Sequence, residues 1–175
     1  VYCVGPSFRA EPGSDDRHLT EFQMMEIEFA GDFDKLLHHI ESFVYSIAHD
    51  ITKLPIHKQK EMGLSELDVA RLAKVKPVFP KITYYEAIEK LGLSWGDDIN
   101  SKKEAELVAM HDNHPIFITR YPDPLWDHKK DIEVEKFFNM LPDKATPGLV
   151  LSADLILPGA GEAVGSAARV DDPET

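Results

Sequence analysis

The chain has 175 residues, which is enough for one domain with a hydrophobic core and too few for two comfortable ones. Its composition, 43% hydrophobic and 29% charged, is typical of a globular protein, and no stretch is long and apolar enough to cross a membrane. The net charge of −12 argues against a surface that coats nucleic acid as a whole, but it leaves room for local basic pockets.

A single cysteine, Cys3, excludes an internal disulfide and indicates a reducing, cytoplasmic compartment. Because Cys3 lies in a predicted strand, we expect a small buried apolar residue rather than a catalytic thiol. The sequence begins without a methionine and in the middle of that predicted strand. We therefore interpret it as an excerpt of a longer protein.

Two apolar runs at the start of the chain, residues 1–8 and 19–30, flank a turn-rich polar segment, and this pattern predicts an antiparallel hairpin. Charged residues gather at the two bases of the loop. They are Arg9, Glu11, Arg17, His18 and Glu21. Guanidinium forks on a rigid hairpin suit a polyanion such as a nucleoside triphosphate, although a surface hairpin with ordinary cross-strand ion pairs explains the same residue types.

The clearest predicted helix covers residues 32–52, where apolar side chains recur at helical spacing on one broad face. Asp32 or Gly31 can cap its start, and Pro55 ends it. Three histidines lie on or near this helix. No further ligands accompany them, so we interpret them as solvated or hydrogen-bonded rather than as metal ligands.

The middle of the chain reads as shorter elements. Residues 54–61 are polar and lysine-rich, which predicts a loop, and residues 65–74 suggest a short helix. Two capping boxes predict the starts of two more helices. They are Thr83 with Glu86 for residues 84–91, which end at Gly92, and Ser101 with Glu104 for residues 102–110.

Two later segments, residues 116–121 and 150–157, are predicted strands, and a glycine-rich turn follows the second. Asp154 and Glu162 flank this turn, and their hard carboxylate oxygens are ligands that magnesium prefers. Taken alone, the two acids are equally compatible with a structural or solvated pair.

The order of these residues resembles a known family. Phe-Arg-Ala-Glu, followed after five residues by Arg-His-Leu-Thr-Glu-Phe, resembles motif 2 of the class II aminoacyl-tRNA synthetases that handle aspartate, asparagine and lysine. About ten residue types in fixed spacing make this match specific. Asp-Leu-Ile-Leu-Pro-Gly-x-Gly-Glu, which starts at Asp154, resembles the asparaginyl enzymes, and the resemblance extends over essentially the whole chain.

The resemblance implies an α/β fold of the α+β type, with an antiparallel sheet flanked by helices. Residues 1–175 would form a partial catalytic domain, because motif 1 would precede them and motif 3 would follow them. The helix at residues 32–52 would pack behind the sheet, and the pocket would lie on the other face. The full-length protein would be a homodimer.

The resemblance also implies roles for single residues. The implied ATP-binding residues are Arg9, Glu11, Arg17, His18, Phe22 and Glu162. Arg9 would clamp the α-phosphate and Phe22 would stack on adenine. Arg17 and His18 would hold the γ-phosphate end, and these two residues would form the catalytic set together with Arg9.

The remaining implied contacts concern the amino acid and the metal. Glu21 and Arg169 would bind the amino acid, with Arg169 reading its side-chain amide or carboxylate. Glu21 and Glu11 would orient adenine or the substrate amine. Glu162, with help from Asp154, would hold Mg²⁺ against the ATP phosphates.

Two departures from the family pattern leave the substrate and the acceptor open. Residues 123–135 contain an insertion, and Val170 replaces the acid that usually follows Arg169, which could let this arginine prefer aspartate over asparagine. A tRNA acceptor would make the protein an asparagine-tRNA ligase, whereas ammonia or a small amine would make it a synthetase paralog similar to asparagine synthetase. A non-catalytic regulatory domain is the alternative from another class.

Overall fold

The computed structural model describes residues 1–10, 19–124, 132–134 and 139–170. These residues fall into two compact units, residues 1–32 and residues 33–175. Three of the predicted ATP-binding residues, Glu11, Arg17 and His18, lie outside the described residues, as does most of the insertion at 123–135.

The first unit is the predicted hairpin. Strands β1 (Tyr2–Phe8) and β2 (Glu21–Ile27) pair antiparallel, which confirms that prediction. The expected burial of Cys3 was wrong, because its side chain is exposed and its Sγ lies 3.5 Å from Glu26 Oε2. Among residues 1–10 and 19–32, which the structure describes in this unit, none is buried.

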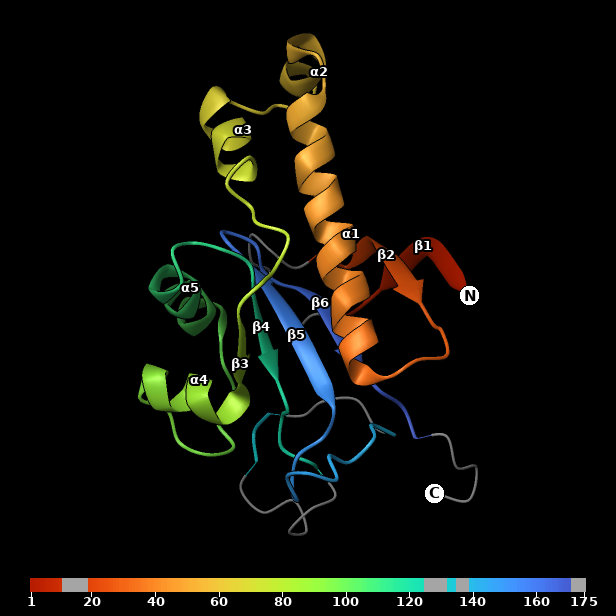
Figure 1. The fold of residues 1–175 in the computed structure, drawn as a ribbon, viewed down its shortest axis with the longest axis vertical. Coiled ribbons are helices and arrows are strands. Elements are labelled where there is room, and N and C mark those ends of the chain that lie inside the picture. Colours follow the sequence, from red (N-terminus) through yellow and green to blue (C-terminus); the bar gives the residue numbers. More distant parts are fainter. Residues whose placement is uncertain (11–18, 125–131, 135–138, 171–175) are drawn as a thin grey trace. The chain divides into compact units, whose positions relative to one another are not determined.

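The second unit contains a four-stranded sheet in the order β3 (Lys81–Thr83), β4 (Ile116–Thr119), β5 (Ser152–Leu157) and β6 (Gly161–Ala167) (Figure 1). β4, β5 and β6 pair antiparallel, as expected, whereas the edge strand β3 runs parallel to β4. The parallel edge follows from the chain between these strands, because its two helices make the long crossover that parallel pairing needs.

The two faces of the sheet carry different helices (Figure 1). Helix α1 (Phe33–Lys53) covers one face, and α4 (Tyr84–Leu91) and α5 (Ser101–Met110) cover the other. Buried residues from both strand and helix form one core on each face. The α1 core includes Phe33, Leu37, Ile40, Phe79, Phe117, Ala153 and Leu155. The α4/α5 core includes Tyr84, Ile88, Leu91, Leu107, Ile116, Ile118, Tyr121 and Ile156.

Two predictions in the helical segments were wrong. The predicted loop at 54–61 is largely helix α2 (Ile56–Glu61), which begins directly after Pro55. Proline has no N–H to contribute and is well tolerated at a helix start, so here it separates α1 from α2 without preventing the second helix. None of the α2 residues is buried, which is why the segment reads as a polar loop.

The start of α5 also differs from the prediction. Its N-cap is Asn100, whose side-chain oxygen accepts from the N–H groups of Lys102 and Lys103, each at 3.2 Å. Ser101 is therefore the first helical residue, not the cap. The other capping box is confirmed, because Thr83 and Glu86 bond reciprocally at the start of α4. Helix α3 (Glu66–Leu72) lies within the predicted range of 65–74. Among the described residues, no helix is long and apolar enough to span a membrane.

Candidate functional site

The strand register of the hairpin places Arg9 and Phe22 on one face. Ser7 pairs with Phe22, and the Arg9 N–H donates to the Thr20 carbonyl at 3.0 Å, so the ladder continues one pair beyond β1. Because side chains alternate between the faces of a strand, Arg9 and Phe22 point to the same side and Glu21 points to the other. The face with Arg9 and Phe22 could take a phosphate and a flat ring together, and the role of Glu21 stays a prediction.

Asp154 and Glu162 lie on one face of the sheet, the face that α4 and α5 cover. Asp154 on β5 pairs with Ile118, a member of the α4/α5 core, and is only 4% exposed. Glu162 on β6 is exposed and pairs with Ile156, beside a register shift in β5 and β6. The bulge brings Glu162 to the same face of the sheet as Asp154. Its partner on β5 is Ile156, two residues after Asp154.

This acid pair fits a magnesium ion that binds together with a phosphate ligand. The described residues contain no group of three or more histidine, cysteine, aspartate or glutamate side chains that could hold a metal by themselves. Mg²⁺ usually binds proteins through one or two carboxylates plus substrate phosphates and water. Asp154 and Glu162 therefore supply the expected number and kind of protein oxygens.

Tyr121 is a further polar residue at this site that the sequence analysis did not assign. Its side chain is almost fully buried, and its hydroxyl is hydrogen-bonded to the Asp154 carboxylate. Burial raises the pKa of Tyr121 well above its ordinary value, and the negative charges of Asp154, Glu162 and Glu104 raise it further. The hydroxyl therefore keeps its proton and acts as a donor to Asp154.

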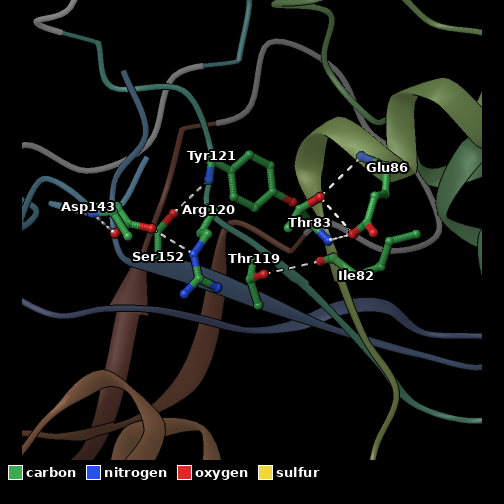
Figure 2. Close-up of polar contacts among 9 residues, drawn as sticks. Ile82, Thr83, Glu86, Thr119, Arg120, Tyr121, Asp143 and Ser152 are labelled. Carbon is green, nitrogen blue, oxygen red and sulfur yellow. Dashed lines mark hydrogen bonds and ion pairs between the residues drawn. The ribbon is translucent and has the colours of Figure 1, made fainter. Parts of the chain in front are cut away.

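The backbone corner before Tyr121 has unusual geometry (Figure 2). Arg120 has a φ of +60°, which is uncommon for a residue other than glycine. Its Nε lies 2.7 Å from Asp143 Oδ2, and its guanidinium carbon lies 5.8 Å from the Phe33 ring centre. Burial opposes ionisation of Asp143, but hydrogen bonds from the Ala145 N–H and from Arg120 lower the pKa of Asp143 below its ordinary value.

Arg169 lies in an extended segment beyond β6. It bridges to Met140 antiparallel, and Ala168 before it packs in the α1 core. Alternation along the extended segment places Arg169 on the same sheet face as Asp154, where its side chain is exposed. The register thus puts one cation and two acids on a single face; the relation of Arg169 to Arg9 stays a prediction.

The chain matches one family of known proteins over its whole length. The sequence profile described as tRNA synthetases class II (D, K and N) matches residues 1–175, and the chain belongs to this family.

Within the family, the chain is similar to asparaginyl enzymes. It is 36% identical to the asparagine-tRNA ligases of Chloroflexus aurantiacus and Herpetosiphon aurantiacus, over 99% of this chain but only 39% and 40% of those proteins. The solved structure of asparaginyl-tRNA synthetase from Pyrococcus horikoshii, complexed with asparaginyl-adenylate, matches with a TM-score of 0.81. That match has 34% identity and covers 98% of this chain and 38% of the other.

Proposed function

We propose that the chain is part of an ATP-dependent ligase that activates asparagine, or aspartate, as an aminoacyl-adenylate and transfers it to tRNA. The observation that carries this proposal is similarity over nearly the whole chain to asparagine-tRNA ligases, together with a structural likeness to a relative that holds asparaginyl-adenylate. A homodimer in the full-length protein and a cytoplasmic location belong to the same proposal.

The activation step needs charge neutralisation and positioning more than a protein nucleophile. A carboxylate oxygen of the amino acid attacks the α-phosphorus of ATP, the bond to the β-phosphate oxygen breaks, and pyrophosphate leaves with its electron pair. Arg9 clamps the α-phosphate, and Arg17 with His18 stabilises the leaving group. Phe22 stacks on adenine, on the same hairpin face as Arg9, and Glu11 orients the base.

The acid pair is assigned to the metal ion in the same proposal. A magnesium ion held by Glu162 and Asp154 would neutralise the negative charge of the ATP phosphates. Asp154 is buried and bonded to Tyr121, so it is suited to hold the magnesium ion in a fixed position. Glu162 is exposed, so the ion can reach it from solvent.

The amino-acid end is assigned to Arg169, with Glu21 as the second contact. Arg169 lies on the same face as the acid pair, so it can address the other end of an elongated adenylate. Val170 follows it where the family pattern has an acid. Val170 adds no negative charge beside Arg169 where an acid would, and this observation supports aspartate as the second candidate substrate.

Two measurements on the full-length protein test the proposal. Amino-acid-dependent exchange of pyrophosphate into ATP, compared for asparagine and aspartate, reports which amino acid is activated. Transfer to tRNA, compared with product formation from ammonia or a small amine, reports the acceptor. Exchange with asparagine followed by tRNA charging is the expected result. Activity with aspartate and ammonia, without tRNA, would favour a paralog similar to asparagine synthetase. No exchange with either amino acid would favour a non-catalytic regulatory domain.

A further inference from the structure

The side chains of residues 116–121 do not alternate regularly between the two faces of the sheet. Ile116 and Ile118 belong to the α4/α5 core, and Phe117 between them belongs to the α1 core. Continued alternation would send the side chain of Arg120 to the α4/α5 face and that of Tyr121 to the α1 face. The structure shows the reverse arrangement.

The left-handed residue causes this inversion. The guanidinium of Arg120 lies against Phe33 at the start of α1, and the ring of Tyr121 packs against Tyr84 of α4, with 5.2 Å between ring centres. The φ of +60° at Arg120 therefore inserts one irregular step, after which Tyr121 lies on the face that carries Asp154.

The surroundings hold this corner from two directions (Figure 2). Ser152 accepts from the Arg120 N–H with its carbonyl at 2.9 Å and from the Tyr121 N–H with its hydroxyl at 3.3 Å. Asp143 holds the Arg120 side chain. A strained backbone position persists only where its neighbours over-determine it, and such positions cluster at functional sites.

The place that Tyr121 reaches is rich in negative charge. Asp154, Glu162 and Glu104 all act electrostatically on the phenol, so a neutral donor that adds no charge suits this position. Phenylalanine would fill the same core volume, and only the hydroxyl adds the bond to Asp154. Residues that hydrogen-bond to a metal-binding carboxylate orient it and usually matter for metal affinity.

We propose that Tyr121 is a positioning residue for the acid pair: the corner at Arg120 turns its hydroxyl to Asp154, which fixes the carboxylate beside Glu162 for a divalent cation. This inference rests on the proposed function, in which Asp154 and Glu162 hold that cation. In this proposal Tyr121 acts through Asp154 and is not itself a ligand of the cation.

The test is equilibrium binding of Mn²⁺ to the full-length protein, measured from the electron paramagnetic resonance signal of the free ion. The α,β-methylene analogue of ATP is included because it cannot release pyrophosphate. Tyr121→Phe should weaken Mn²⁺ binding about tenfold, the lower end of the usual effect of such a supporting residue. An unchanged dissociation constant would overturn the proposal.

Tyr84→Phe is the matched control. Its ring neighbours that of Tyr121 and is fully buried, but its hydroxyl bonds to the Asp97 carbonyl at 2.7 Å and the Gly96 N–H at 3.0 Å, away from the acids. Tyr84→Phe should lower the unfolding temperature and leave Mn²⁺ binding unchanged. Equal weakening by both variants would mean that Tyr121 acts only through core packing, which would also overturn the proposal.

Two further variants distinguish a failure of the Tyr121 proposal from a failure of the proposed metal site. Asp154→Asn and Glu162→Gln should each weaken Mn²⁺ binding; if they do but Tyr121→Phe does not, the positioning role fails and the metal site stands. If neither acid variant changes binding, the metal site of the proposed function fails as well. Should Tyr121→Phe not fold, Ser152→Ala decides, because it removes a bond to the Tyr121 backbone and keeps the hydroxyl. Weaker Mn²⁺ binding by Ser152→Ala supports the proposal, and unchanged binding overturns it.

Discussion

The hairpin unit and the sheet unit position their candidate site residues by different means. None of the described residues 1–10 and 19–32 is buried, and the shared face of Arg9 and Phe22 follows from strand pairing alone. In the sheet unit, Asp154 is buried on the face that α4 and α5 cover, and its partner Tyr121 is positioned by a backbone corner that Ser152 and Asp143 hold.

This difference separates the effects that a substitution can have. An exposed side chain on a hairpin can be changed with little effect on folding, so a loss of activity in such a variant reports a lost ligand contact. A side chain in either core contributes through packing, and its loss lowers stability whatever its role. Substitutions in the two units should therefore have effects on stability and on activity that can be told apart.

The largest expected effect on stability is in the sheet. Phe117 on β4 is fully buried in the α1 core, so Phe117→Ala should lower the free energy of unfolding by about 3–5 kcal/mol. Val4→Ala on the hairpin, where the side chain is 64% exposed, should change it by less than about 0.5 kcal/mol. Urea unfolding measures both, and similar losses from the two variants would contradict the comparison.

The largest expected effect on activity is in the hairpin. Arg9→Ala should reduce pyrophosphate exchange by the full-length protein about a hundredfold or more, because the proposed guanidinium contact to the reacting phosphate would be lost. Arg9→Lys should also fail, since an ammonium group cannot reproduce the planar fork. Both variants should keep the wild-type unfolding temperature, because Arg9 is exposed.

Arg71→Ala is the control for charge. Its side chain is 69% exposed on α3, where Nη1 lies 3.6 Å from Asp68 Oδ1. Losing this arginine should leave exchange unchanged, although the net charge changes by the same amount as in Arg9→Ala. Wild-type exchange by Arg9→Ala, or an equal loss in Arg71→Ala, would remove the role of Arg9.

The features that the sequence predicted correctly depend on neighbouring residues. The hairpin, the long helix α1 and the Thr83–Glu86 capping box each follow from periodicity or spacing within one segment, and each is confirmed. Motif 2 is equally local, which is why residue order alone identifies the family. The parallel edge strand β3 and the helix α2 needed context that no such window contains.

The corner at Arg120 could not be predicted for the same reason. Nothing in the strand residues 116–121 marks a left-handed residue, because its partner Asp143 lies 23 residues later and Ser152 later still. Regular alternation would place Tyr121 on the α1 face, away from Asp154. The bond between the two side chains therefore cannot be predicted from the strand pattern. Pro122 restricts the backbone of Tyr121 before it, but it does not indicate a left-handed residue at Arg120.

The ion pair at this corner gives a smaller and pH-dependent effect. The pKa of Asp143 is lowered from 3.8, so the unfolded state binds more protons near that pH, and stability present above about pH 4 is lost as the pH falls. Asp143→Asn should cost about 1–3 kcal/mol at pH 7, because a hydrogen bond to a charged group is lost. Its stability should also fall less steeply below pH 4 than that of the wild type. Parallel curves for the two proteins in acid unfolding would contradict this role.

The smallest effect distinguishes two adjacent residues at the start of α5. The sequence pattern favours Ser101 as the cap, paired with Glu104, whereas in the structure Asn100 accepts two backbone N–H groups. Asn100→Ala should therefore lower the free energy of unfolding by about 1 kcal/mol, because these N–H groups lose their acceptor. Ser101→Ala should be neutral or slightly stabilising, since alanine is the better residue at a helical position. Thermal unfolding of the two variants decides between the caps: a larger loss in Ser101→Ala would restore the capping box that the sequence predicts and would shift the helix start by one residue.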